Sequence, residues 1–450
     1  MTSATLLHRV SSAALALALL AAAGCSKATD GADGTDGTDN GSDTPSPAIA
    51  KTHAKVDDGD YDSAGATTIK LADGSSKVTG AGAKVKGDVV TITEAGTYLL
   101  SGSLSDGQVD VNSAGDGKVK LVLDGVDIAS ANTSPLVITA ADEAVVILAD
   151  GSKNTLSDAV AAGADDEKPD APTATLYSAD DLTIAGTGSL TVNGKSNNGI
   201  VGNDGLVILA GTIAVDALDD AIGGKDYLVI DDGTLSVTAG GDGLQSNGDT
   251  PGELGWMRFD GGTATIEALS DGISAEGSVT VTGGTVDVTK SDDGVKSRVI
   301  ALSGGTVSVT AITDGIKASS GATAPGAAEV VEDGVELTIS DGTVNIDAGG
   351  DGIDSKGSAT ITGGLVTIGK AGKNAIDVLG ATETPDEVDL SLTAPGKVEL
   401  KDTDDGVVAG FTATKAGPRL LMAKEITSGE TYTVTVDGNE TGTVTATSRP

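Results

Sequence analysis

A repeat with a period near 22 residues constrains the fold of this chain more than any other feature. Its marker is Asp or Asn, then Gly or Ala, then an aliphatic residue, which falls at positions 200, 222, 244, 273, 295, 316, 353 and 376. The successive spacings are 22, 22, 29, 22, 21, 37 and 23 residues, so two of them carry insertions. A period this short is typical of a solenoid, in which each repeat forms one coil.

Each repeat contains two segments in which aliphatic residues alternate with Thr, Ser or Asp. In one repeat these are residues 278–282 and 285–289, separated by Gly283 and Gly284. The marker supplies a third short segment, as in residues 293–297. Alternation predicts strands with one buried face, while glycine pairs and β-branched residues exclude helical repeats. We therefore predict an all-β chain that forms a parallel β-helix, a solenoid of about 22 residues per coil.

Charge and composition narrow the classes of function. The 450 residues include 66 acidic and 28 basic side chains, which give a formal net charge of −38. Because phosphate recognition needs a basic footprint, we expect no nucleic-acid partner. Aromatic residues are only 2% of the chain, so the core must consist of Val, Ile, Leu, Ala and Thr. The single cysteine, Cys25, excludes an internal disulfide.

The first residues have the features of an export signal. Arg9 precedes an apolar run over residues 10–23, which is too short to span a membrane and ends in small residues before Cys25. We predict a lipoprotein signal peptide over residues 1–24, lipidation at Cys25 and a location on the extracellular face of the bacterial cell envelope. Contact with a membrane is expected only through this N-terminal lipid. The alternative is an ordinary signal peptide with a chance cysteine.

Three further regions follow the signal peptide. Residues 25–64 are rich in Asp and Gly and predict a flexible tether, in which His53 also lies. Residues 65–384 are assigned to the β-helix. Residues 385–450 change to longer alternating strands, which predict a small C-terminal β cap over the last coil.

Stacked coils place the marker aspartates above one another, about 4.8 Å apart. The predicted metal ligands among them are Asp220, Asp242, Asp271, Asp293, Asp314 and Asp351. Carboxylates at this spacing repel by roughly 1 kcal/mol per pair in water, so something must offset their charge. We predict Ca²⁺, which takes about six to eight oxygen ligands in irregular geometry. The alternative is a tight turn, in which Asp bonds the local backbone and Gly takes a positive φ.

One aromatic cluster predicts a sugar platform. Alternation places Met257 and Phe259 inward and Trp256 and Arg258 outward on one strand. The apolar face of a sugar ring stacks on indole, and Arg pairs with carboxylates, so Trp256 and Arg258 are predicted to bind carbohydrate. The alternative is that Trp256 packs under the neighbouring loop.

Two lysines occupy equivalent positions on successive coils. Lys296 and Lys317 each follow a marker Asp by three residues, and Arg298 is nearby. They are predicted to bind carbohydrate by holding an acidic sugar that Ca²⁺ bridges to the aspartates. The alternative is that they only neutralise the acidic ladder. The same residue types also suit a polysaccharide lyase, in which a Lys or Arg removes a proton next to a uronate carboxylate.

Several segments together resemble the bacterial family of carbohydrate-binding domain-containing proteins. They are residues 96–108, 121–128, 149–158, 178–184 and 429–434, in this order and spacing. The resemblance covers about residues 65–440. It implies a right-handed parallel β-helix of pectate-lyase-like shape that binds plant-type polysaccharide, pectic or cellulosic, and uses Ca²⁺. The chain departs from the family pattern at both ends of the ladder, with Ala221, Ala375, Asn198 and Asn374.

We therefore predict a monomeric, lipid-anchored surface protein that binds polysaccharide with Ca²⁺ and does not catalyse a reaction. The net negative charge repels uronate ligands unless cations bridge them to the protein, so neutral glucans remain an alternative class of ligand. His8 is lost with the signal peptide and His53 lies in the tether, which excludes His-based triads and zinc sites. The alternatives are a Ca²⁺-dependent lyase for acidic polysaccharide, and a structural surface protein or adhesin that Ca²⁺ only stabilises.

Overall fold

The computed structural model describes residues 51–159, 173–248, 254–321, 328–369 and 372–449. Thr52–Pro450 form one compact unit. The regular structure of the described residues is entirely β, and this part of the chain contains no helix long and apolar enough to cross a membrane. The predicted signal peptide and Cys25 lie outside the described residues.

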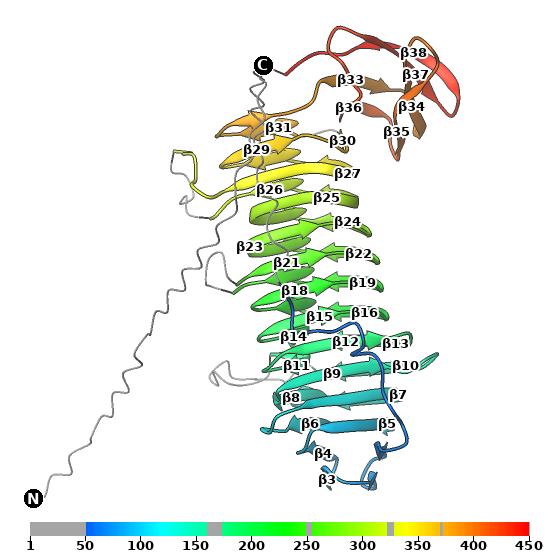
Figure 1. The fold of residues 1–450 in the computed structure, drawn as a ribbon, viewed down its shortest axis with the longest axis vertical. Helices are drawn as coiled ribbons and strands as arrows, with labels where there is room; N and C mark the ends of the chain where they lie inside the picture. Colours follow the sequence, from blue (N-terminus) through cyan, green and yellow to red (C-terminus); the bar gives the residue numbers. More distant parts are fainter. Residues whose placement is uncertain (1–50, 160–172, 249–253, 322–327, 370–371, 450) are drawn as a thin grey trace, which may run out of the picture. The chain divides into compact units, whose positions relative to one another are not determined.

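The chain passes around a common core in successive layers, and most strands pair in parallel with the equivalent strand of the next layer (Figure 1). Three faces result, which we name by a feature of each. The ladder face carries the marker aspartates and consists of β4 (Val89–Ile92), β6 (Gln108–Asn112), β8 (Leu136–Ala140), β11 (Ala174–Ser178), β14 (Asn198–Gly202), β17 (Ile222–Gly224), β20 (Leu244–Ser246), β26 (Ile316–Ala318), β28 (Ile353–Ser355) and β31 (Ile376–Val378).

The strap face carries Trp256. It consists of β1 (Thr67–Leu71), β9 (Glu143–Leu148), β12 (Leu182–Gly186), β15 (Gly205–Ile208), β18 (Tyr227–Ile230), β21 (Trp256–Phe259), β29 (Ser358–Ile361) and β32 (Thr382–Glu383).

The threonine face is named for the Thr residues that recur at its outward positions. It consists of β10 (Lys153–Asp158), β13 (Ser189–Gly194), β16 (Thr212–Ala217), β19 (Thr234–Ala239), β22 (Thr263–Ala268), β24 (Thr285–Ser291) and β30 (Leu365–Ile368).

Five long strands continue around the corners and contribute to two or three faces. They are β5 (Gly96–Leu104), β7 (Lys118–Ser130), β23 (Ile273–Val281), β25 (Val295–Ala311) and β27 (Glu336–Ala348). At the first layers, β2 (Lys77–Thr79) and β3 (Ala83–Lys86) pair antiparallel with β1 and β4. At the last layers, β36 (Gly417–Ala423) pairs antiparallel with β30 and with β33 (Glu387–Leu392).

This topology corrects the predicted fold class. The all-β prediction is confirmed, but the open right-handed parallel β-helix is wrong as a description of how the strands are joined. The strands named above belong to one continuous sheet of 34 strands, which closes around a single apolar core. The physical reason is that the corner-crossing strands merge hydrogen-bonded ladders that we expected to be separate and open. We call this sheet the wall.

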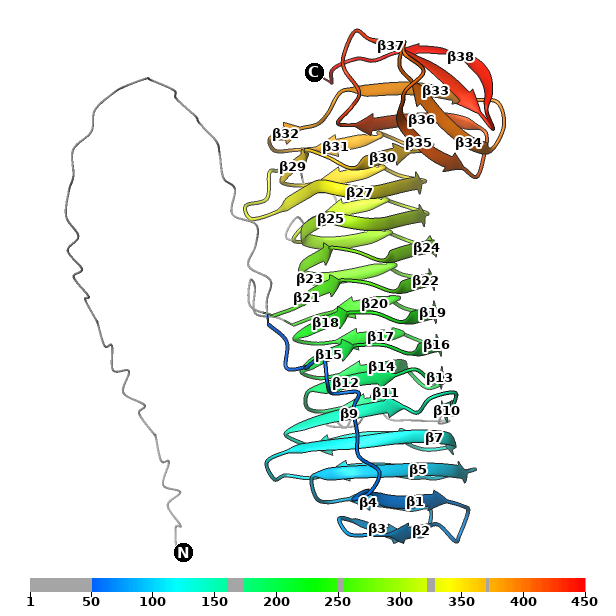
Figure 2. The same cartoon turned by 45° about the vertical axis from the view of Figure 1, so that its right-hand side comes forward.

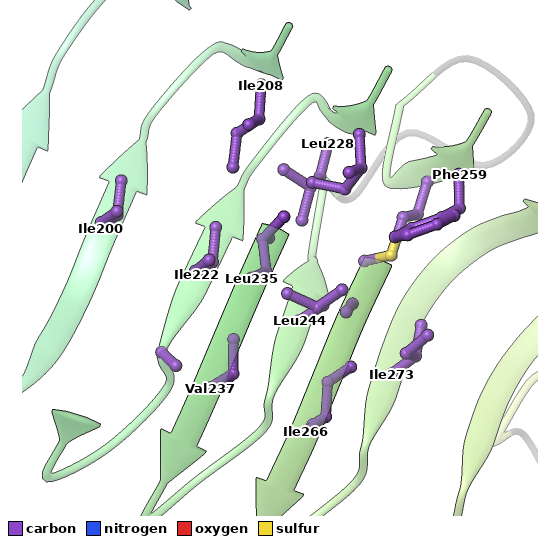
Figure 3. Close-up of a cluster of buried hydrophobic side chains, with 14 of the residues drawn as sticks. Ile200, Ile208, Ile222, Leu228, Leu235, Val237, Leu244, Phe259, Ile266 and Ile273 are labelled. Atoms are coloured by element: carbon purple, nitrogen blue, oxygen red, sulfur yellow. The ribbon is translucent and has the colours of Figure 1, made fainter. Parts of the chain in front are cut away.

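The wall forms because each strand alternates inward aliphatic with outward polar side chains. Strand β22 alternates exposed Thr or Glu with buried Ala and Ile. Buried side chains from the three faces meet in the interior, as Figure 3 shows for Leu235, Leu244 and Phe259. Met257 and Phe259 point inward, as predicted, and pack in this core.

A second, smaller sheet follows the last layers. It is antiparallel and consists of β34 (Gly396–Lys401), β35 (Val407–Ala413), β37 (Thr431–Val436) and β38 (Asn439–Thr445). Its apolar core includes Phe411 and Tyr432 and is separate from that of the wall. Because β36 covers the edge of β30, the last parallel strand of that face is not left open to pairing with another chain.

Residues 53–60, which we call the strap, lie on the outer side of the strap face. Figure 2 shows this segment, drawn in blue, passing β15, β12 and β9 on its way to the first layers. Under it, every residue of β9 is buried, on both sides of the strand. His53 and Asp58, which the sequence placed in the tether, are therefore in contact with the wall.

Candidate functional site

The marker residues form a ladder of hydrogen bonds from backbone to side chain. Each backbone N–H donates, over 2.7–3.2 Å, to Oδ1 of the marker one layer earlier: Asp220 to Asn198, Asp242 to Asp220, Asp271 to Asp242, Asp293 to Asp271, Asp314 to Asp293, Asp351 to Asp314 and Asn374 to Asp351. These bonds satisfy N–H groups that the turn would leave unpaired. The Asp side chain therefore accepts a hydrogen bond from the backbone, as the tight-turn alternative predicted. The donor, however, belongs to the next layer and not to the turn of the Asp itself.

Where glycine follows a marker Asp, it is required because side chains of the threonine face lie too close for a Cβ atom. A Cβ at Gly294 would lie 2.1 Å from Cγ1 of Val309, and one at Gly315 would lie 2.3 Å from Cγ2 of Ile346. Neither glycine has a positive φ, so the conformational reason that we predicted for it is wrong. The ladder face lies against inward side chains of the threonine face, and a methyl group does not fit between them.

Lysines neutralise one half of the ladder. Lys296 Nζ donates to Asp271 Oδ2 at 2.9 Å, and Lys317 Nζ donates to Oδ2 of Asp293 at 3.1 Å and of Asp314 at 3.0 Å. Burial opposes the charged form of Lys317, but the two carboxylates outweigh burial and raise the pKa of Lys317 above its usual value. These contacts favour charge neutralisation over the predicted grip on an acidic sugar.

The other half of the ladder has no such partner. Among the described residues, no Lys or Arg forms an ion pair with Asp220 or Asp242, and Gln245 Nε2 donates to Asp242 Oδ2 at 3.1 Å. Burial raises the pKa of Asp220 to about 6, and the charges of Asp242 and Asp219 act in the same direction.

This donor set does not fit Ca²⁺ along the ladder. Oδ1 of each aspartate accepts a backbone N–H, and the second oxygen of Asp271, Asp293 and Asp314 accepts a lysine. Ca²⁺ needs about six to eight oxygen ligands. Within the described ranges no group of three or more His, Cys, Asp or Glu side chains is arranged to hold a metal. The use of Ca²⁺ by this chain stays a prediction.

Trp256 and Tyr227 form a stacked pair on the strap face. Their ring centroids are 4.7 Å apart at an interplanar angle of 15°. The rings stack because β18 and β21 pair in register, with Tyr227 opposite Trp256. In the next layer Ser278 stands opposite Trp256, so no third ring continues the stack. Trp256 is half-buried, and its indole ends an aromatic column at the surface.

Charged side chains flank this pair. Arg258 Nε lies 2.5 Å from Asp260 Oδ2, and the Arg258 guanidinium carbon lies 5.9 Å from the centroid of the Trp256 ring. An indole beside a guanidinium and a carboxylate combines an apolar surface with hydrogen-bond donors and acceptors. That combination suits a polyhydroxylated ring.

His53 is a member of this site that sequence reasoning missed. Its backbone N–H donates to the Tyr227 hydroxyl at 3.0 Å, and its Nδ1 lies 2.7 Å from the same oxygen. Nε2 lies 2.9 Å from Thr183 Oγ1, and Nδ1 lies 3.2 Å from Asp181 Oδ1. One signal existed: the run 144–148 is apolar throughout, which indicates a strand buried on both sides and therefore something that covers it.

The predicted site residues fall into two groups on different faces. Trp256 and Arg258 lie together on the strap face with Tyr227. Lys296 and Lys317 lie with the aspartates on the ladder face. The structure therefore does not unite the four predicted carbohydrate-binding residues in one site.

Comparison with protein families gives the class of this chain. A family model for carbohydrate-binding domain-containing proteins matches residues 86–371 and 276–438, well over half of the sequence. The chain belongs to this family. The family predicted from the sequence is thus confirmed.

A member of the carbohydrate-binding domain-containing family from Acetivibrio thermocellus is similar to part of the chain. The two are 42% identical over 128 residues, which is 28% of this chain and 45% of the relative. The match spans less than half of the length of that relative.

A solved structure is also similar in sequence. It is described as a polysaccharide lyase-like protein from C. thermocellum, in a gadolinium derivative. It is 31% identical, covers 55% of this chain and 95% of its own, and superposes with a TM-score of 0.46.

Proposed function

We propose that this family member binds polysaccharide through the aromatic pair on the strap face and does not alter its ligand chemically. The observation that carries the proposal is the end of the aromatic column at Trp256, where Ser278 leaves the place of a third ring to a ligand. A sugar ring stacked there would bury its apolar face on the indole. The Arg258–Asp260 pair would then meet its hydroxyl groups.

Neutral glucans of the cellulosic type suit this site better than pectic chains. The chain carries a net charge of −38, which repels polyanions. Arg258 is already paired with Asp260. We therefore propose that binding does not require a cation bridge.

The lysines support a binding protein over a lyase. A lysine that removes a proton needs a lowered pKa. Burial would lower the pKa of Lys296, but the carboxylates of Asp271 and Asp293 outweigh it and raise that pKa above its usual value. Lys317 is shifted in the same direction. Both side chains are therefore held in the protonated form.

The location at the cell surface also belongs to this proposal. A lipid on Cys25 would hold the protein on the extracellular face of the envelope, with residues 25–52 between the lipid and the strap. The cysteine at the end of the signal-like run supports this arrangement.

Mobility in native gels tests the binding site. Gels are cast with soluble neutral glucan or polygalacturonate, each with Ca²⁺ or EDTA. We expect the glucan to retard the protein with or without EDTA, and Trp256→Ala to weaken retention by roughly thirtyfold, as for an interface hot spot. Tyr61→Ala removes another exposed aromatic ring and should leave retention unchanged.

Three results would contradict the proposal. Retention of Trp256→Ala equal to the unmodified protein would place the site elsewhere. Retardation only by polygalacturonate with Ca²⁺, followed by unsaturated sugar products, would favour the lyase alternative. Retardation by neither polysaccharide would favour a structural surface protein.

A further inference from the structure

The strap contacts the aromatic pair through His53, which lies beside the Tyr227 ring and its hydroxyl. His53 approaches this oxygen twice, through its backbone N–H at 3.0 Å and through Nδ1 at 2.7 Å. The His53 side chain is only 9% exposed. Its other ring nitrogen lies 2.9 Å from Thr183 Oγ1 on β12, two layers before β18 and one layer before β15. The imidazole therefore links the Tyr227 hydroxyl to a fixed strand of the wall.

The layer below Tyr227 places no side chain directly opposite it. The residue opposite in β15 is Gly205, where an added Cβ would lie 2.2 Å from Tyr227 Cζ. The tyrosine ring thus lies directly over the backbone of a glycine, which contacts it closely but has no side chain to hold it. Its position depends on Gly205 beneath, Trp256 above and His53 at the hydroxyl. Burial raises the pKa of Tyr227 to about 12, so the hydroxyl keeps its proton for these bonds.

The rest of the strap is fastened elsewhere and independently of this site. Lys118 Nζ lies 2.5 Å from Asp58 Oδ1 and 2.5 Å from Glu143 Oε1. Lys120 Nζ donates to the carbonyls of Asp58 at 3.0 Å and Asp60 at 2.5 Å. Loss of the His53 imidazole would therefore remove one of the two contacts to the Tyr227 hydroxyl, and the link from Tyr227 to Thr183, without detaching the strap.

We propose that His53 is a positioning residue of the carbohydrate site: it fixes Tyr227, and Tyr227 in turn fixes the indole of Trp256 for the sugar ring. This inference rests on the proposed function, because it assigns a role within that site. It also makes the N-terminal segment part of the site, since the strap reaches the wall beside the aromatic pair. His53 itself does not contact the ligand.

Two readouts test this role, one with ligand and one without. The ligand readout is retention by neutral glucan in native gels. The second is quenching of Trp256 fluorescence by acrylamide in the absence of glycan, which is specific because the chain has one Trp. We expect His53→Ala to weaken retention about tenfold, as for the loss of a partly buried hydrogen bond, and to increase quenching. Lys120→Met, which loosens the distal part of the strap, should change neither.

Two conservative variants separate the contacts of the imidazole. The amide of His53→Asn lies near the position of Nδ1 and can still reach Tyr227, whereas the amide of His53→Gln lies nearer to Nε2 and Thr183. We expect His53→Asn to retain glucan better than His53→Gln. A merely structural strap contact would give the opposite order or no difference.

The failure of this inference is distinct from the failure of the proposed function. If Trp256→Ala loses retention while His53→Ala keeps it, with unchanged quenching, the positioning role is overturned and the binding site stands. If the unmodified protein is retained by no glycan, the proposed function fails, and quenching alone decides the positioning role: increased quenching in His53→Ala supports it and unchanged quenching overturns it.

Discussion

The aspartate ladder has two halves that share one backbone role and differ in charge balance. Around Asp293, each carboxylate accepts a backbone N–H and also faces a lysine. At Asp220 and Asp242, the same N–H bonds form at 2.7 and 2.9 Å without any lysine. The hydrogen bonds therefore do not need the lysines. The backbone bond determines where each Asp lies, and the neighbouring cation determines how much the buried charge of that Asp destabilises the folded state.

The largest expected effect comes from breaking the ladder at a buried aspartate that faces a lysine. Asp293→Ala leaves the Asp314 N–H without its acceptor and removes one of the two carboxylates that face Lys317. We expect a loss of about 3–5 kcal/mol in the free energy of unfolding, measured by urea denaturation. Asp293→Asn keeps the acceptor and should lose much less. Equal losses for the two variants would show that charge, not the backbone bond, is the main contribution.

The next effect tests the lysine alone. Lys317→Met keeps the aliphatic stem and leaves Asp293 and Asp314 without their cation. We expect destabilisation by about 2 kcal/mol at pH 7, because two buried carboxylates become uncompensated. The matched change in the other half, Gln245→Met, removes a neutral donor from Asp242 and an exposed acceptor from Asn247, and should cost about 1 kcal/mol. A larger loss of unfolding free energy for Gln245→Met than for Lys317→Met would contradict the stabilising role of the lysine.

A third change should stabilise the protein. Asp220→Asn keeps an oxygen for the Asp242 N–H, as Asn198 does for Asp220 one layer earlier. It also removes a charge with which no Lys or Arg of the described residues forms an ion pair. Since Asp220 is partly exposed and solvent screens its charge, we expect a gain of about 1–2 kcal/mol at pH 7. Destabilisation in thermal unfolding would contradict this account.

The same carboxyl predicts a dependence on pH. Burial raises the pKa of Asp220 from 3.8 to about 6 in the folded protein, so protonation favours the folded state. The contribution of Asp220 to stability is most favourable near pH 4 and is lost as the pH rises through about 6. Between pH 5 and pH 7, we therefore expect the melting temperature of Asp220→Asn to fall less than that of the unmodified protein. Melting temperatures that fall in parallel for the two proteins would contradict this role of Asp220.

The smallest effect concerns metal removal. Because backbone donors and lysines occupy most of the carboxylate oxygens, we expect EDTA to lower the melting temperature by less than about 1 °C. Any stabilisation by Ca²⁺ should come from the half without lysines and should disappear in Asp220→Asn. A shift of several degrees that persists in that variant would place a calcium site elsewhere.

The sequence predicted the strands and the inward residues of the wall, because both follow from alternation within a repeat. It could not predict the continuity of the sheet, since nothing local shows that β25 will turn two corners without losing its pairing. The outward position of Trp256 was readable from register, but its partner Tyr227 was not, because insertions hide which residues stand opposite. His53 was missed for a related reason: its contacts are 130 and 174 residues away along the chain.

The marker bonds all run in one direction along the chain. In every step the acceptor belongs to the earlier layer and the donor to the later one, from Asn198 onward to Asn374. At the same corner the backbone N–H groups of Gly199, Gly272 and Gly294 donate in the opposite direction, to the carbonyl of the marker Asp one layer later. Each marker turn is thus bonded to the layers on both of its sides, so neighbouring layers complete each other's hydrogen bonds and no layer is satisfied alone.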